Sequence, residues 1–105
     1  MDIPYRPLGL LRELVEVMGL QITHVFEDLL FIEHNAFLLQ MGEEGADVRL
    51  WFNSQSLPAE RPAIAATLTA AGMERGLRID RRGTFRLTQE EGAEQLQLEL
   101  FDGVL

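Results

Sequence analysis

Residues 20–53 read LQITHVFEDLLFIEHNAFLLQMGEEGADVRLWFN, and this stretch decides the fold. Apolar and polar side chains alternate along it with the period of two that is typical of β-strands. The alternation predicts strands over residues 20–26, 29–33, 36–41 and 47–53, with turns at 27–28, 34–35 and 42–46. Asn35 suits a tight hairpin, because asparagine tolerates a positive φ better than most residues. The stretch therefore predicts a four-stranded antiparallel meander.

Helical periodicity replaces this alternation on both sides of the meander. Apolar residues recur at helical spacing over residues 7–18, and Gly19 is suited to end that helix. A second helix is expected over residues 59–73, where Pro62 favours a helix start and Gly76 favours a stop. Its apolar side is made mainly of alanine, which permits close approach to the first helix or to the sheet.

The chain ends with a second group of predicted strands, near residues 77–81, 84–88 and 95–101. Asp80-Arg81-Arg82-Gly83 is expected to form a turn between the first two, since Asp is favoured at the first position and Gly at the fourth. The whole order is helix, antiparallel meander, helix, antiparallel meander. It predicts an α+β fold in which both helices pack on one face of the sheet.

Short matches relate the two halves of the chain. Gly19-Leu20-Gln21-Ile22 corresponds to Gly76-Leu77-Arg78-Ile79 at the end of each helix, and residues 43–47 correspond to residues 90–94. These matches suggest that residues 6–53 and 61–101 are pseudo-repeats of one duplicated unit. The alternative is that helix ends and turns reuse Gly and Glu for physical reasons. Under both interpretations, residues 1–105 form a single α+β domain.

The first meander is apolar on both of its faces. The turn at 27–28 pairs Phe26 with Leu29, His24 with Phe31 and Ile22 with Glu33. The turn at 34–35 pairs Phe31 with Leu38, and directly paired residues share a face. We expect the face beneath the helices to contain Leu20, Ile22, Phe26, Leu29, Phe31, Leu38, Val48, Leu50 and Phe52. The opposite face then contains Val25, Leu30, Ile32, Phe37, Leu39, Met41 and Trp51.

This second apolar face predicts an interface, because large exposed apolar patches mark contact surfaces. A twofold homodimer is the commonest arrangement of such a surface, and Trp51 is the residue expected to anchor it. The alternative is that the face is covered within the chain, either by the second meander or by curling of the sheet.

Charge and composition exclude several functional classes. The 105 residues include 17 acidic and 9 basic side chains, for a net charge of −8, and there is no Cys. All the basic residues are Arg, so a disulfide framework, a thiolate nucleophile and a Schiff-base lysine are excluded. An acidic chain is poorly suited to neutralise phosphates, so no nucleic-acid partner is expected. The sequence predicts neither an export signal nor a membrane span, which favours a cytoplasmic location.

Candidate residues for catalysis or metal binding are sparse. His24 and His34 are the only histidines, and the predicted strand register places them too far apart to bind one metal ion. Ser54 and Ser56 are the only serines, and neither lies in a nucleophile motif. We therefore expect no catalytic residue, no metal and no cofactor.

Arginines are concentrated in residues 75–86, which contain five of them and one Asp. This concentration predicts an anion-binding site formed by Arg78, Arg81, Arg82 and Arg86. The alternative is that Arg78 and Arg86 form cross-strand ion pairs with Glu99 and Asp80 on a solvated sheet face.

Together these patterns predict a small acidic protein-binding module, adaptor or chaperone-like, that acts as a homodimer. Its partners would be a second copy and another protein, with no membrane and no nucleic acid. The alternative is a small-ligand binder or weak enzyme with a pocket between helix and sheet. Such a pocket would use Arg78, Arg86, His24 or Glu33 as its polar groups.

Overall fold

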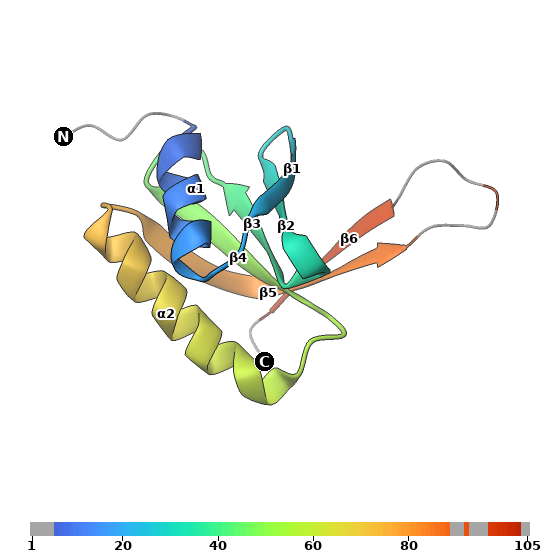
Figure 1. The fold of residues 1–105 in the computed structure, drawn as a ribbon. Coiled ribbons are helices and arrows are strands. Elements are labelled where there is room, and N and C mark those ends of the chain that lie inside the picture. Colours follow the sequence, from blue (N-terminus) through green and yellow to red (C-terminus); the bar gives the residue numbers. More distant parts are fainter. Residues whose placement is uncertain (1–5, 89–91, 93–96, 104–105) are drawn as a thin grey trace.

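A computed structural model of the chain describes residues 6–88, 92 and 97–103. These residues form two α-helices and one six-stranded sheet (Figure 1). The helices are α1 (Leu8–Val17) and α2 (Arg61–Glu74), and single turns of 3-10 helix occur at Glu33–Asn35 and Pro58–Glu60. The strands are β1 (Ile22–Phe26), β2 (Leu29–Ile32), β3 (Phe37–Met41), β4 (Asp47–Asn53), β5 (Arg78–Thr88) and β6 (Gln97–Asp102). The α+β class predicted from the sequence is confirmed.

The strands follow one another across the sheet in chain order, from β1 at one edge to β6 at the other. Neighbouring strands are antiparallel except for β4 and β5, which are parallel. Parallel neighbours need a long crossover connection, and α2 supplies it here. The sheet is therefore mixed, and its two antiparallel parts are joined edge to edge through the β4–β5 pair.

The predicted turn at residues 80–83 is wrong, because these residues lie within the single long strand β5. Gly83 pairs with Asp102 of β6, and a Cβ atom added to Gly83 would clash with the carbonyl oxygen of Phe101. This glycine permits the close approach of a neighbouring strand, a common reason for glycine within a strand. A register shift at Arg82 bends the strand at the same point. The expected strand over residues 95–101 begins outside the described residues.

Most of the predicted pairing of the first three strands is confirmed. Phe26 pairs with Leu29, and Phe31 pairs with both His24 and Leu38. The tight turn between β2 and β3 also forms as expected, with His34 at φ 62° and Asn35 at φ 49°. A bulge in β1 makes one difference, since Ile22 pairs with Ile32 where the turn geometry predicted Glu33.

Both helices end on glycines of the same conformation. Gly19 has φ +76° and Gly76 has φ +77°, and in each case the next residue donates its N–H to a carbonyl of the last helical turn. Four strands follow α1 and two follow α2, so the resemblance between the two halves is seen at the ends of the helices. The duplication of residues 6–53 in 61–101 stays a prediction, and the matching residues 90–94 lie almost wholly outside the described residues. Neither described helix is long and apolar enough to cross a membrane.

The larger core lies between the two helices and one face of the sheet. Leu11, Leu14 and Val15 of α1 and Leu68 of α2 are fully buried there. Alternate residues of three strands fill the other side of this core: Leu30, Ile32, Phe37, Leu39, Met41, Val48, Leu50 and Phe52. A helix pair on one face of a sheet buries both apolar surfaces at once.

Arg61 fixes the connection from β4 into α2. It is 4% exposed and is the buried charged residue of the described chain. Its Nη2 donates to the carbonyl oxygens of Asn53 at 3.2 Å and Ser56 at 3.0 Å, and its Nε donates to Ser56 Oγ at 3.0 Å. These hydrogen bonds satisfy the buried guanidinium and join the end of β4 to the first turn of α2.

Candidate functional site

The structure places five of the seven predicted interface residues beneath the helices. Leu30, Ile32, Phe37, Leu39 and Met41 are between 0% and 4% exposed and belong to the larger core. The cause lies in the β3–β4 connection, where Leu39 pairs with Leu50 and Leu38 pairs with Trp51. The predicted grouping of Val48, Leu50 and Phe52 with Leu38 was therefore wrong by one residue in register, and such a shift exchanges the two faces of a strand.

Trp51, the expected anchor, lies on the opposite face of the sheet but is 5% exposed. It forms a second buried cluster with Leu38 and Phe85, against which Leu29, Phe31, Leu87 and Leu98 pack. Leu29 on β2 and Leu98 on β6 share this cluster although three strands separate β2 from β6 in the sheet. The sheet must therefore curl, and the curl covers this face from within the chain.

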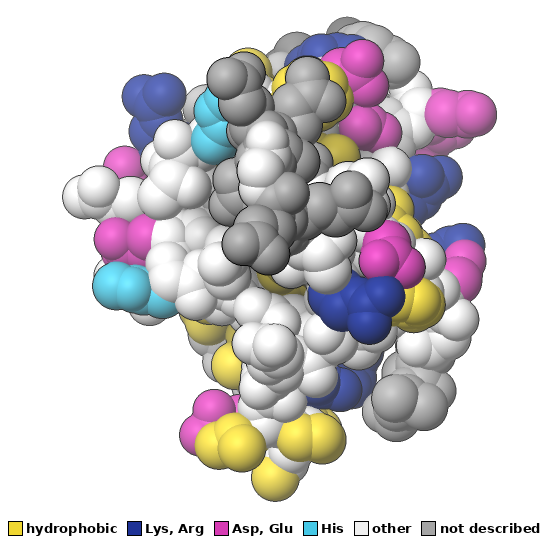
Figure 2. Space-filling view, turned by 90° about the vertical axis from the view of Figure 1, so that its right-hand side faces the viewer, with side chains coloured by type: hydrophobic (Ala, Val, Ile, Leu, Met, Phe, Trp, Pro, Cys, Tyr) yellow, Lys and Arg dark blue, Asp and Glu magenta, His cyan; other side chains and the backbone are white. Residues whose placement is uncertain are grey.

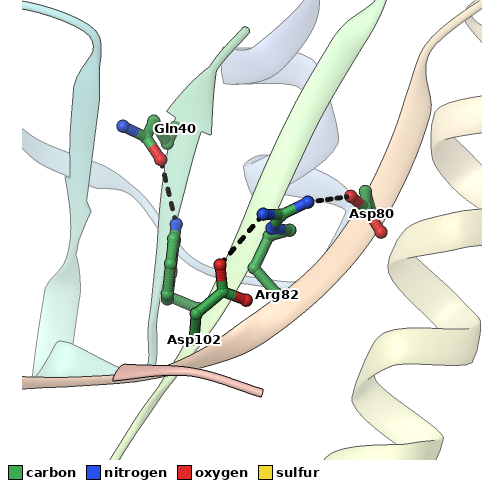
Figure 3. A network of polar contacts seen from close by, with 5 residues as sticks. Gln40, Asp80, Arg82 and Asp102 are labelled. Atoms are coloured by element: carbon green, nitrogen blue, oxygen red, sulfur yellow. Dashed lines mark hydrogen bonds and ion pairs between the residues drawn. The ribbon is translucent and has the colours of Figure 1, made fainter. Parts of the chain in front are cut away.

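A short polar chain holds Trp51 in place. Its indole Nε1 donates to Gln40 Oε1 at 3.2 Å (Figure 3). Gln40 Nε2 in turn donates to Asp28 Oδ2 at 3.0 Å. Buried indole N–H groups normally find such a partner. The contact fixes the tryptophan as part of the smaller cluster, and Val25, at 43% exposed, is the predicted interface residue that stays well exposed to solvent.

Carboxylates surround the arginines of β5. Arg78 donates to Asp47 at 2.7 Å and to Glu44 at 3.0 Å, and these hydrogen bonds and charges raise the pKa of Arg78 above its ordinary value. Arg82 bridges Asp102 at 3.0 Å and Asp80 at 3.3 Å, and its pKa is likewise raised by those hydrogen bonds (Figure 3).

The other two predicted anion ligands point elsewhere. Arg86 donates to Glu99 at 2.8 Å, the cross-strand pair that the alternative interpretation expected. Arg81 stacks on the ring of Phe52, with 5.1 Å from its guanidinium carbon to the ring centre. Arg78 and Arg82 line one hollow of about 400 Å³, but Glu43, Glu44, Asp47 and Asp80 line it too. Anion binding stays a prediction, and it would have to displace these carboxylates.

The histidines lie at separate places in the fold. His24 is exposed on β1, with its ring centre 6.0 Å from that of Phe31, and His34 is in the β2–β3 turn. Glu33, another residue of the predicted pocket, is 4.0 Å from His34. Within the described residues, no group of three or more His, Asp or Glu side chains could hold a metal ion.

The outer side of α2 has an unusual composition. Between Glu60 and Glu74, Arg61 is the one charged residue, and it points into the protein. The exposed positions of this helix are Pro62, Ala63, Ala66, Thr67, Ala70, Met73 and Glu74, and we call the first six of them the α2 outer face. A helix exposed to water normally carries charged residues on that side. The α2 outer face carries none.

Two large apolar side chains bracket the α2 outer face. Met73, in the last turn, is 71% exposed, and Leu57, just before the helix, is 63% exposed. These are the highest values among the large apolar side chains that the structure describes. Figure 2 shows apolar side chains gathered at the lower tip of the molecule, the end where α2 begins in Figure 1. The uncharged run over residues 62–73 was visible in the sequence, but its alanines were expected to pack inward.

A second distinctive surface runs along the first edge of the sheet. A hollow of about 450 Å³ lies between α1 and β1. Leu8, Arg12 and Glu16 form its helical wall, and the consecutive residues from Gln21 to Val25 form the other. Because consecutive residues of one strand line it, the hollow follows the outer backbone of β1. Of the groups predicted for a pocket between helix and sheet, His24 is the one found here.

Comparison with known proteins gives no relative: no family model, no curated protein and no solved structure matches the chain. The function is therefore argued from the geometry of these surfaces.

Proposed function

We propose that this protein is a protein-binding module, adaptor or chaperone-like, that acts as a homodimer. The observation that carries the proposal is the α2 outer face, a helical surface that has no charge between the exposed Glu60 and Glu74 and has exposed Leu57 and Met73 at its ends. Exposed apolar surface of this kind is typical of contact sites. The chain has a net charge of −8, so two copies repel each other least where they meet without charges.

A twofold arrangement suits this surface. When two α2 helices pack antiparallel, the start of each meets the end of the other, and Leu57 of one copy comes near Met73 of the other. The 14 residues of α2 span about 21 Å, which gives several turns of contact. Alanine and threonine side chains allow the two backbones to approach closely, and the larger end residues then fill the space beyond.

Sedimentation equilibrium tests the proposal. The wild-type protein should sediment as a dimer at micromolar concentration, and Ala66→Arg should give a monomer, because each copy would bring a charge into the middle of the contact. Glu43→Arg is the matched control, since it puts an arginine on the exposed β3–β4 turn, outside the α2 outer face. A monomeric wild type, or a dimer that Ala66→Arg leaves intact, would contradict the proposal.

Small-ligand binding is a second candidate, favoured by the hollow between α1 and β1. Its volume of about 450 Å³ falls within the range of ligand pockets, and His24 offers an imidazole ring. A thermal-shift screen of metabolites tests this candidate. A ligand that binds the hollow should raise the melting temperature of the wild type and lose its effect in His24→Ala.

A further inference from the structure

The two edges of the sheet differ in charge. The β6 edge carries Glu99 and Asp102, which arginines of β5 bind. The β1 edge, Ile22–Phe26, has no Asp, Glu or Arg, and four of its five residues are exposed. Natural sheets usually protect an edge with charges or a covering segment, because an unprotected edge pairs with other strands. Within the described residues, no strand pairs with the outer side of β1.

A strand added beside β1 would also contact α1 across the hollow at this edge. Leu8, Arg12 and Glu16 lie four residues apart on α1, so their side chains follow one another about every 6 Å. Alternate side chains of a β-strand follow one another about every 6.6 Å. A strand added beside β1 therefore presents successive same-side residues to Leu8, Arg12 and Glu16 in turn.

The charges on this wall are available to a partner. Arg12 and Glu16 are both exposed, and among the contacts of the described residues neither side chain has a hydrogen bond or an ion pair. Leu8 is 40% exposed. A complementary strand would place an apolar residue at Leu8, an acidic residue at Arg12 and a basic residue at Glu16.

The direction of a strand bound beside β1 follows from the relative directions of α1 and β1. The chain reverses between α1 and β1, so the helix and the strand run in opposite directions (Figure 1). A strand that pairs antiparallel with β1 therefore runs parallel to α1 and meets Leu8 first. Antiparallel pairing is also slightly more stable per residue than parallel pairing.

We infer that the β1 edge binds an extended segment of a partner protein, in which an apolar, an acidic and a basic residue occupy alternate positions in that order. A second copy is the poorer occupant, because its own β1 has no charged residue to meet Arg12 and Glu16. The inference rests on the proposed protein-binding function, and it does not depend on the α2 contact.

Two synthetic peptides test this inference. The first has Leu, Asp and Arg at alternate positions with Thr between them, and the second has the same composition with Asp and Arg exchanged. Fluorescence anisotropy should show that the wild type prefers the first peptide by about fivefold to tenfold, the size expected from two exposed ion pairs. Backbone amide shifts should locate the bound peptide at residues 21–25.

The double variant Arg12→Glu, Glu16→Arg provides the decisive comparison. It preserves the net charge, and both positions are exposed, so the fold should be unaffected. The inference predicts that this variant reverses the preference between the two peptides. It is overturned if neither peptide binds at millimolar concentration, if the preference is absent or survives the double exchange, or if the amide shifts lie away from β1.

Failure here is distinguishable from failure of the dimer. The same samples report their mass by sedimentation, so a dimer that ignores both peptides contradicts the strand-binding site and leaves the α2 contact standing. Conversely, the monomeric Ala66→Arg protein should still prefer the first peptide. Loss of that preference in a folded Ala66→Arg monomer would overturn the independence claimed for the two surfaces.

Discussion

At the scale of single residues, Arg61 contributes most to the connection between β4 and α2. A charged hydrogen bond to a buried carbonyl is worth about 1.5–3 kcal/mol, and a carbonyl left without a partner is costly. We expect Arg61→Met to lower the free energy of unfolding by about 2–4 kcal/mol, measured by urea denaturation. The exposed Arg12→Met is the control and should change it by less than about 0.5 kcal/mol. Equal effects of the two substitutions would show that the Arg61 contacts do not stabilise the fold.

Leu39 and Val25 provide a second contrast between buried and exposed residues. Leu39 is 0% exposed in the larger core, whereas Val25 is 43% exposed on β1. Leu39→Ala should lower the free energy of unfolding by about 2–5 kcal/mol, because it opens a cavity. Val25→Ala should cost less than about 1 kcal/mol. The fluorescence of Trp51, the single tryptophan, reports both transitions. A stable Leu39→Ala that merely dissociates would instead support the face assignment expected from the sequence.

At the scale of elements, β5 is distinguished by Gly83. Gly83→Ala should lower the free energy of unfolding by about 1–3 kcal/mol, because the new Cβ forces the Phe101 carbonyl of β6 away from β5. Gly9→Ala is the matched control: nothing lies within 4 Å of its Cβ position in α1, and alanine favours helix by about 0.5–1 kcal/mol. Opposite signs for the two substitutions are expected in urea denaturation. A neutral Gly83→Ala would favour the turn predicted from the sequence.

The ion pairs of β5 predict a weak response to pH and to anions. A raised pKa means that the folded state holds the proton of Arg78 or Arg82 more tightly, so this stabilisation is complete below the ordinary arginine pKa. It is lost as the pH rises through the raised value. These groups should therefore leave the melting temperature unchanged between about pH 7 and pH 9.

Phosphate tests whether the same arginines bind anions. Because carboxylates already occupy Arg78, Arg82 and Arg86, millimolar phosphate should raise the melting temperature no more than sodium chloride of equal ionic strength. A specific stabilisation that disappears in Arg82→Gln would establish the anion site predicted from the sequence.

The sequence predicted the helices and most strands well, but it predicted poorly which residues lie on which face of the sheet. The reasons can be identified. Tight turns fix the register of the strands they join, so the pairs Phe26–Leu29 and Phe31–Leu38 were predictable. The longer connection over residues 42–46 leaves the register between β3 and β4 uncertain by one residue. A shift of one residue moves every side chain of β4 to the opposite face of the sheet. The pairing of β4 with β5 is set by the α2 crossover, which has no local signal in the strands.

The surfaces proposed for binding were predictable to different extents. The uncharged run of α2 is visible in the sequence, but which of its alanines face solvent depends on how the helix packs. Val25 was expected at an interface, and it does lie beside the hollow along β1. The match between the spacing of Arg12 and Glu16 and that of a strand appears only when α1 and β1 are placed side by side.

At the scale of the whole molecule, negative charge and apolar surface are distributed unequally. Residues 1–60 carry three Arg and ten acidic residues, whereas residues 61–105 carry six Arg and seven acidic residues. The acidic half contains the larger core strands, so its charge keeps a strongly apolar segment soluble. The α2 outer face interrupts this charged surface, which is why a contact between copies is expected there.

Cross-linking through a single introduced cysteine tests that contact most directly. The natural sequence has no Cys, so Ala66→Cys provides one thiol at the middle of the α2 outer face. A short bis-maleimide should convert most of this variant into covalent dimer at micromolar concentration. Glu43→Cys, on the exposed β3–β4 turn outside the α2 outer face, should stay monomeric on denaturing gels. Cross-linking of Glu43→Cys as efficient as that of Ala66→Cys, or none at Ala66→Cys, would contradict the account.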